Sequence, residues 1–272
     1  MVIVDLRLHY PYRQSRRQAV SSPYTDSFMN LIRQTRRSFL LLAGLPFSGL
    51  ASSGYATLSG VRFRRIRNGR STRRYLVIHG DETTARDVLL DHMKTRQGHA
   101  YLVESETRAA RPHLLEIDPN RMFSNQGASI SIERLNASAG QQTIEREVKW
   151  LAARRHQLFN ALLPPAGGLL IALHNNARGY SVNEEVPISN RVHLPSPSTP
   201  HEFFLATAVS DFDLLVTGPY DAVLQSEAKG EDDGSLSRLC AARGVRYVNL
   251  ECALGNRKAQ AEMLAWLDGL LP

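Results

Sequence analysis

The chain has 272 residues, 43% of them hydrophobic, so it can bury a sizeable core in one α/β domain with an extra segment or in two small domains. Its formal net charge of +7 is unevenly distributed: residues 1–74 carry 14 Lys and Arg against 2 Asp and Glu, and the remaining residues carry 19 against 24. A nucleic-acid-binding surface needs basic residues on the folded domain, so this distribution argues against a nucleic-acid partner.

Residues 1–56 are predicted to be a leader with an export signal, and residues 57–272 a single folded domain. The paired arginine at 36–37 is followed by an apolar run to Leu50 and by small residues to Ala56, which is the order of a secretory signal. It resembles a twin-arginine signal and predicts a periplasmic or exported protein. The apolar run is too short to span a bilayer, so no stable membrane insertion is expected. If the run is instead a short amphipathic or buried helix, the protein is cytoplasmic.

An export signal belongs at the start of a chain, and Met29 lies a few residues before the twin arginine. We therefore hypothesise that Met29 is the true start, and that residues 1–28 are either not translated or form a disordered leader. N-terminal sequencing of the exported protein tests this, because a mature start upstream of Arg36 contradicts export.

Strand-like and helix-like patterns alternate along the predicted domain. Strands are predicted at 57–74 (an edge strand and turn), 75–78, 101–103, 168–173, 203–208, 214–216 and 245–250. Helices are predicted at 83–96, 143–163, 236–243 and 258–271, where apolar residues recur at helical spacing. The polar segments 106–130 and 175–200 are predicted to be irregular and to form the walls of a pocket. This alternation predicts a mostly parallel or mixed sheet with helices on both faces.

Two cysteines, Cys240 and Cys252, are too few for a disulfide framework or a four-cysteine zinc site. We predict that both are buried thiols, with one disulfide between them as the alternative.

Three predicted strands end on a residue that can bind a metal ion or move a proton: His79, His174 and Glu251. Sheets of this class place their ligands beyond the carboxyl ends of the strands. His79 and Glu82 are joined by a tight turn, so both can reach one cation, and His174 supplies a second imidazole. Two histidines and a carboxylate form a known catalytic zinc set. Glu251 is then a candidate general base and acid, which takes a proton from water and passes it to a leaving amine.

Asn120 and Arg121 offer an amide and a guanidinium, and Arg suits a planar carboxylate better than Lys does. Arg108 and Arg111 lie just upstream, and one of them could polarise the scissile carbonyl and hold its developing oxyanion. Taken singly, each of these residues also fits an ordinary role, such as a solvated histidine, a surface carboxylate or an arginine that covers a polar loop.

Four motifs stand in a fixed order: His79-x-x-Glu82, Asp118-x-Asn120-Arg121-x-Phe123, Leu173-His174-Asn175, and a strand that ends in Glu251 before a final helix. Together they resemble the zinc carboxypeptidase superfamily, most closely its succinylglutamate desuccinylase/aspartoacylase branch. The resemblance spans residues 75–270 and implies a single α/β domain with a mixed, mostly parallel eight-stranded sheet sandwiched between helices.

The resemblance also implies a role for each matching residue. It implies that His79, Glu82 and His174 hold one Zn²⁺ per chain and that Glu251 is the general base and acid. Asn120 and Arg121 would then bind the free carboxylate of the substrate, and Arg111 would stabilise the oxyanion, with Arg108 as the alternative.

Two departures from the branch bear on the expected activity, besides Pro119, which replaces an apolar residue. We expect no C-terminal β domain of the aspartoacylase kind, and the predicted export is unusual for a cytosolic deacylase. Both favour a carboxypeptidase-like zinc metallopeptidase that cuts an amide bond near a free carboxylate, in peptides outside the cytoplasm. A cell-wall peptide is one candidate substrate. The alternatives are an N-acyl amino-acid deacylase and a non-catalytic binding protein on the same fold, which is expected to lack one or more ligands.

Overall fold

The computed structural model describes residues 52–176, 179–227 and 229–272. These described residues form one compact unit. The twin arginine and Met29 lie outside the described residues. The boundary predicted between residues 56 and 57 falls inside the first strand of the unit, which spans Ser52–Leu58.

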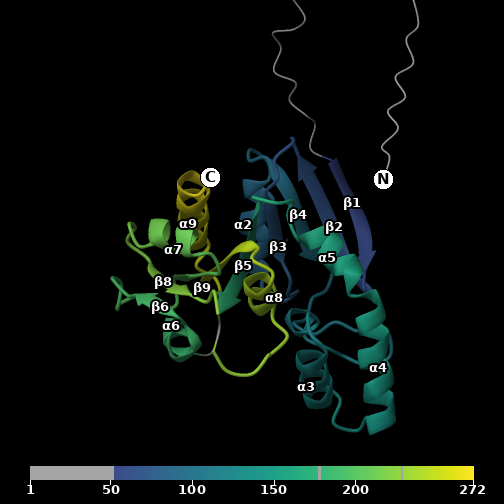
Figure 1. The fold of residues 1–272 in the computed structure, drawn as a ribbon. Helices are drawn as coiled ribbons and strands as arrows, with labels where there is room; N and C mark the ends of the chain where they lie inside the picture. The colour runs from purple at the N-terminus through teal and green to yellow at the C-terminus, as the bar shows by residue number, and fades with distance from the viewer. Residues whose placement is uncertain (1–51, 177–178, 228) are drawn as a thin grey trace, which may run out of the picture. The chain divides into compact units, whose positions relative to one another are not determined.

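A single mixed sheet organises the described residues, in the strand order β1-β2-β4-β3-β5-β9-β7-β8-β6 (Figure 1). The strands are β1 Ser52–Leu58, β2 Val61–Asn68, β3 Arg74–Val77, β4 Gly98–Val103, β5 Leu169–Asn176, β6 Arg191–His193, β7 Phe203–Ala206, β8 Asp221–Leu224 and β9 Arg246–Ala253. The prediction of an α/β fold with a mixed sheet is confirmed. The predictions of eight strands and of a mostly parallel sheet are wrong, because the described sheet has nine strands and four of its eight neighbouring pairs run antiparallel.

The antiparallel strands lie toward the two edges of this sheet. β1 and β2 pair antiparallel through a two-residue turn, Ser59-Gly60, in which both residues have positive φ. Such turns match the right-handed twist of the flanking strands. β2 also runs antiparallel to β4, and β7 runs antiparallel to β9. The edge strand β6 runs antiparallel to β8. The central strands β4, β3, β5 and β9 run parallel to one another, and β7 and β8 also pair parallel.

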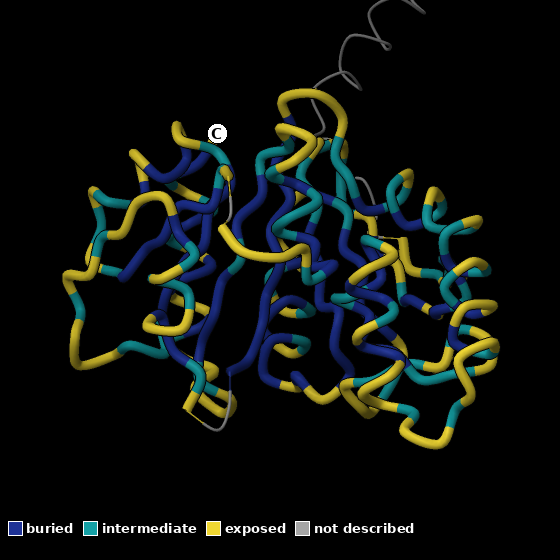
Figure 2. The backbone as a smooth tube through the Cα atoms, turned by 60° about the horizontal axis from the view of Figure 1, so that its bottom comes forward, coloured by how far each residue is buried: buried dark blue, intermediate teal, exposed yellow. Residues whose placement is uncertain are grey.

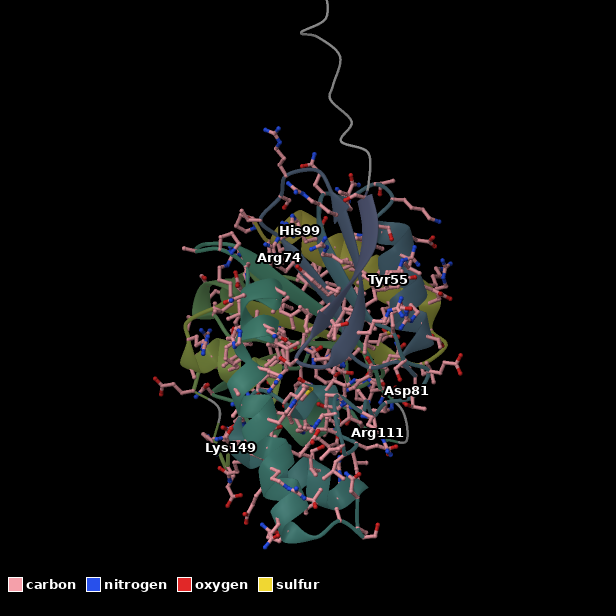
Figure 3. The ribbon with its side chains drawn as sticks, turned by 90° about the vertical axis from the view of Figure 1, so that its right-hand side faces the viewer. Tyr55, Arg74, Asp81, His99, Arg111 and Lys149 are labelled. Carbon is pink, nitrogen blue, oxygen red and sulfur yellow. The ribbon has the colours of Figure 1, made fainter. Side chains whose placement is uncertain are left out.

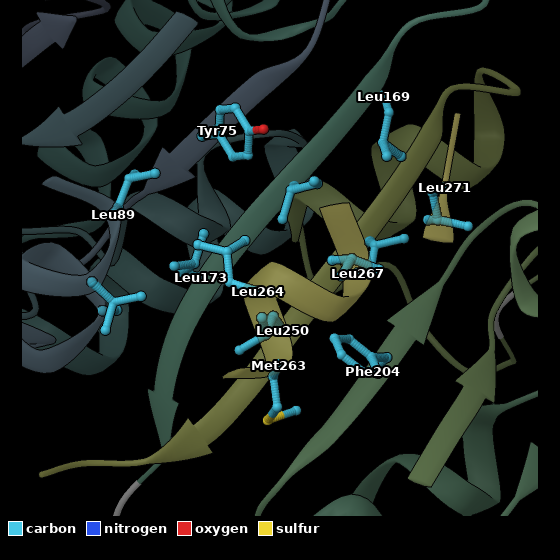
Figure 4. Packing of buried hydrophobic residues seen from close by; sticks show 14 of the residues in the cluster. Tyr75, Leu89, Leu169, Leu173, Phe204, Leu250, Met263, Leu264, Leu267 and Leu271 are labelled. Atoms are coloured by element: carbon cyan, nitrogen blue, oxygen red, sulfur yellow. The ribbon is translucent and has the colours of Figure 1, made fainter. Parts of the chain in front are cut away.

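Helices cover both faces of the sheet. The helices are α2 Thr83–His92, α3 Asn125–Leu135, α4 Gln141–Arg154, α5 His156–Leu162, α6 Val182–Glu185, α7 Val209–Leu215, α8 Leu236–Ala242 and α9 Arg257–Leu270. Buried residues of α2, α7 and α9 pack on one face, and those of α3, α4, α5 and α8 pack on the other. Figure 4 shows Met263, Leu264 and Leu267 of α9 packed close to Leu250 and Phe204 of the sheet. In the described part of the chain, no helix combines the length and apolarity needed to cross a bilayer.

Several predicted elements differ from the observed ones. Residues 214–216, predicted as a strand, fall at the end of α7, where Phe212 and Leu215 are buried at helical spacing. A short apolar run of this kind does not by itself distinguish strand from helix. Segment 106–130, predicted as irregular, contains the start of α3, and segment 175–200 contains α6 and β6. The long helix predicted at 143–163 is two helices, α4 and α5.

The central strands are the most buried part of the compact unit (Figure 2). All eight residues of β5 are buried, including its polar end. Cys240 on α8 and Cys252 on β9 are free and buried, as predicted. Polar side chains at the ends of β5 and β9 are therefore buried, and each needs a hydrogen-bond or ionic partner to offset its loss of water.

The arginine-rich stretch that contributes to the N-terminal charge excess is part of this compact unit. Arginines occupy seven positions between residues 62 and 74, in β2, in the following turn and at the start of β3. The argument against a basic surface counted this charge with the N-terminal segment, although residues 57–74 were predicted to be an edge strand and turn of the domain. The seven arginines lie in the folded unit, so the argument does not hold for them.

Candidate metal centre

Three buried side chains from separate elements converge on one point. His79 follows β3, Glu82 is the N-cap residue of α2, and His174 lies near the end of β5. Their exposed fractions are 0%, 3% and 4%. One ligand atom from each lies within 4.8 Å of those of the other two. The structure therefore brings together the three residues predicted as metal ligands, and they could hold a metal ion.

Gly80 makes the turn between His79 and Glu82 possible. Its backbone N–H donates to the carbonyl of Thr107 at 3.1 Å, and a Cβ at this position would lie 2.3 Å from the carbonyl oxygen of Ser105. Only glycine permits so close an approach of two backbone segments. The Glu82 side chain makes no capping hydrogen bond to α2, so it remains available to the site.

We expect Gly80→Ala to displace the turn, because the new methyl group meets backbone atoms that have no room to move. The expected cost is about 1–3 kcal/mol of unfolding free energy, as for other overpacked sites, together with weaker metal binding. Denaturant unfolding and a metal titration measure the two effects. Gly269→Ala in α9 is the control, since a Cβ there meets nothing within 4 Å, and it is expected to be neutral or slightly stabilising.

Asn175 connects the strand that carries His174 to the helix that begins at Glu82. Its side-chain oxygen accepts a hydrogen bond from the backbone N–H of Ala85 at 2.8 Å, and its amide nitrogen donates to Gln260 on α9 at 2.9 Å. These bonds fix the position of the C-terminal end of β5 relative to the first turn of α2 and to α9. The Leu173-His174-Asn175 motif thus supplies a candidate ligand and the residue that keeps it in place.

Asp118 is a site residue to which no role was assigned from the sequence. Its carboxylate lies 2.8 Å from Nε2 of His79, while Nδ1 of the same ring lies 2.8 Å from Oε1 of Glu82. A carboxylate on the far nitrogen of a ligating histidine fixes the ring and raises its basicity. Asp118 opens the motif that contains Asn120 and Arg121, but its contact with a residue 39 positions away is not visible in the sequence.

The charges in this network perturb one another strongly. Burial lowers the pKa of His79, but the carboxylates of Glu82 and Asp118 outweigh it and raise that pKa to about 9. Burial raises the pKa of Glu82, and the two histidines outweigh it and bring that pKa to about 2. Without a metal ion, His79 therefore carries a proton on each ring nitrogen at neutral pH, and Glu82 is ionised.

One carboxylate oxygen of Glu82 supports the assignment of the site to a cation. Oε1 contacts His79, His174 and Arg108, whereas Oε2 is buried and has no hydrogen-bond partner among the described residues. A buried carboxylate oxygen without a partner is costly. Two imidazoles and a carboxylate are also the donor set that suits a zinc-like ion, so the residues present fit such an ion.

A cavity of about 780 Å³ is lined by two of the three candidate ligands, Glu82 and His174. Of the residues predicted for substrate and catalysis, Arg108, Asn120, Arg121 and Glu251 line it. Arg111 is not among the lining residues; its guanidinium is exposed and pairs with Glu116 at 3.2 Å. Arg108 instead bridges Glu82 at 3.3 Å and Asp118 at 3.4 Å. Of the two arginines considered for the oxyanion, only Arg108 is placed at the cavity.

Glu251 stands directly beside His174, since the two are register partners on the parallel strands β5 and β9. Both strands continue for two residues beyond these positions, so neither residue is the last of its strand. Glu251 is 6% exposed, and burial is the main cause that raises the pKa of its carboxyl to about 7. Asn249 donates to its Oε1 at 3.1 Å. A carboxylate with such a pKa can both accept and release a proton near neutral pH.

Asn120 and Arg121 are held at the cavity by a short 3₁₀ turn, Pro119–Arg121. The carbonyl oxygen of the Asn120 side chain accepts from the backbone N–H of Leu236 at 3.0 Å. Arg121 donates to the Asn120 carbonyl at 2.8 Å and lies 3.7 Å from the carboxylate of Asp233. The long contact to Asp233 leaves Arg121 able to engage another carboxylate.

The far wall of the cavity comes from residues that sequence reasoning did not single out. Tyr180 and Glu185 lie in the segment predicted to form the pocket wall, and Gln225 follows β8. Tyr180 donates its hydroxyl to Glu185, and Gln225 donates its amide to the same carboxylate at 2.5 Å. Nothing in the residue pattern marks this trio, because its three members meet only in the folded chain.

A scan against protein-family models gives no match to this chain. A search of curated proteins gives no match either.

Proposed function

We propose that this chain is a zinc-dependent hydrolase of an amide bond close to a free carboxylate, of the zinc carboxypeptidase type. The observation that carries the proposal is the buried set of His79, Glu82 and His174, of which Glu82 and His174 line one cavity with Glu251. The three residues would hold a zinc ion, which would supply Lewis-acid chemistry at the scissile carbonyl. The metal content of the purified protein, followed by a screen of peptides against N-acyl amino acids, tests the proposal.

Residues of the chain carry out proton transfer, substrate binding and stabilisation of the oxyanion. Glu251 takes a proton from the attacking water and gives it to the leaving amine, for which its raised pKa is suited. Arg121 binds the substrate carboxylate, with Asn120 beside it. Arg108 holds the oxygen of the scissile carbonyl as negative charge develops on it. A binding protein without catalysis is disfavoured, because two of the candidate ligands and a proton carrier line one cavity.

Arg108 and Arg111 give a direct test of the oxyanion role. We expect Arg108→Lys to lower kcat by about 10²–10³-fold, as loss of one oxyanion-hole donor does elsewhere, with a smaller change in KM. Arg111→Lys is the matched control, since its side chain is 61% exposed and pairs only with Glu116. Steady-state kinetics of the two variants show which arginine stabilises the oxyanion. A larger loss of kcat in Arg111→Lys than in Arg108→Lys would assign that role to Arg111.

The charge balance of the cavity favours a leaving residue that also carries a positive group. Of the three arginines in the lining, Arg108 pairs with Glu82 and Asp118, while Arg121 and Arg238 pair with Asp233. Both hydrogen-bond donors to Glu185 in the described chain, Tyr180 and Gln225, are neutral. A cationic group of the substrate would compensate the charge of Glu185. This supports a peptide substrate over a small N-acyl amino acid without a second charge.

Glu185→Gln is expected to raise KM about tenfold for substrates whose leaving residue is basic, and to leave matched neutral substrates unchanged or improved. The amide keeps the shape of the carboxylate and an acceptor for Tyr180, and the Gln225 amide has to turn so that its oxygen accepts from the new NH₂ group. The ratio of kcat/KM for a basic and a neutral substrate measures the effect. An equal loss on both substrates would assign Glu185 a structural role instead.

A further inference from the structure

We propose that a second site, at the opposite end of the sheet from the candidate metal centre, binds a phosphate-class oxyanion. The site consists of Arg65 and Arg67 on β2, His99 on β4 and Arg74 on β3. Figure 3 shows Arg74 and His99 close together, well away from Asp81, which lines the cavity of the metal centre. The proposal does not depend on the hydrolase function.

Strand register brings these side chains into one row. Arg67 is the register partner of His99, and His99 is the register partner of Arg74. Residues directly opposite in neighbouring strands point to the same face of a sheet. Arg65 lies on the same face two residues before Arg67. The row is half-buried at His99 and Arg74 and exposed at Arg65 and Arg67, so solutes can reach it.

The row concentrates positive charge without an acidic residue to balance it. Like charges placed directly opposite one another destabilise a sheet. The charged groups that shift the pKa of His99 are Arg74, Arg67 and Arg65; with burial as the largest cause, they lower it to about 4. Among the ion pairs of the described residues, none involves Arg65, Arg67 or Arg74. The neighbouring Arg73, on the other side of the strand, does have such a partner in Asp268.

Arg74 provides a second, independent observation. Its Nε is buried and has no hydrogen-bond partner among the described residues. A guanidinium N–H left without an acceptor is unfavourable. No hydrogen bond or ion pair within the described residues engages this guanidinium, so its two Nη groups can donate to an oxyanion at the row. The planar fork of Arg matches the oxygens of phosphate, and several cations in a row suit more than one phosphate group. The geometry therefore points to a ligand with multiple negative charges, such as pyrophosphate, rather than to a single carboxylate.

Calorimetric titration of the full chain with inorganic phosphate and with pyrophosphate, at constant ionic strength, tests the proposal. We expect both anions to bind, pyrophosphate about tenfold more tightly, because it contacts more of the row. Arg67→Gln and Arg74→Gln are expected to weaken pyrophosphate binding at least about tenfold. Arg62→Gln is the matched control, since Arg62 lies on the same strand but faces the other way, over the ring of Tyr55 at 4.3 Å.

His99 reports on binding at the row itself. Its imidazole titration, followed by NMR, should move to higher pH in the presence of pyrophosphate, because the bound anion compensates the arginines. Absence of binding by either anion would overturn the proposal. So would pyrophosphate binding that persists unchanged in Arg67→Gln, since the anion would then sit elsewhere, for example at the metal centre. If Arg74→Gln fails to fold, the exposed Arg67 still provides the test.

Discussion

Glu251→Gln is expected to lose nearly all turnover while keeping its metal. The amide preserves the size of the side chain and its contact with Asn249, but it cannot accept a proton from water. General acid–base catalysis of this kind contributes about 10²–10⁴-fold, and kcat/KM should fall by that factor. Single-turnover and steady-state kinetics measure the loss, and metal analysis of the same preparation shows whether the ion is retained.

Asp81→Asn is the control for this experiment. Asp81 also lines the cavity and undergoes the same change from carboxylate to amide, but its side chain forms no hydrogen bond or ion pair with any of the three candidate ligands among the described residues. Its activity is expected to stay near that of the unmodified chain. Full activity in Glu251→Gln would remove the mechanism, and loss of metal in that variant would show that Glu251 acts on the ion rather than on the proton.

The pH dependence of the reaction follows from the same residue. Glu251 must be ionised to accept a proton, so kcat/KM should rise with pH through the pKa of its carboxyl. Burial raises that pKa to about 7, and a bound cation favours the ionised form. The acidic limb of the profile is therefore expected at or below pH 7, and it should disappear in Glu251→Gln.

Removing the metal is the second change with a large expected effect. We expect one equivalent of zinc per chain, complete loss of activity on chelation, and recovery when zinc is restored. A ligand that binds only the folded state stabilises it by about 3 kcal/mol at about 100 times its Kd, so chelation should also lower Tm. Metal analysis, activity and thermal unfolding before and after chelation measure these effects.

His174→Ala should reproduce the effect of chelation, because it removes one of the three ligands and a contact of Oε1 of Glu82 at 3.2 Å. His156→Ala is the matched control, since that histidine is exposed on α5 and contacts only the backbone of Ala153. Stoichiometric zinc and unchanged activity in His174→Ala would contradict the assignment of His174 as a ligand.

The sequence alone was sufficient to predict features that depend on residues close together in the chain. His79 and Glu82 are three residues apart, so their proximity follows from their spacing, although the contact with Ser105 that requires a glycine at position 80 is not local. The apolar runs around 75–78, 168–173 and 245–250 are buried strands because each must hide its side chains from water. The class of fold and the candidate ligand set were predictable at this level.

Contacts between segments far apart in the chain could be identified only from the tertiary structure. Asp118 reaches His79 across 39 positions, and His174 meets Glu251 only because β5 and β9 are neighbours in the sheet. Arg108 and Arg111 are three residues apart in an irregular segment, where no periodicity shows which one faces the cavity. The antiparallel strands toward both edges were likewise invisible, since pairing direction depends on partners and not on the strand's own residues.

The arginines between residues 62 and 74 show both what the sequence predicts and what only the tertiary structure decides. Their number and sign are plain in the sequence, and residues 57–74 were predicted to be an edge strand and turn, but the sequence did not show which of their side chains share a face. Strand pairing decides that Arg67, His99 and Arg74 form a row and that Arg62 faces away from it. Composition thus determined the charge of this protein, while the register of hydrogen bonds between strands decided where that charge is concentrated.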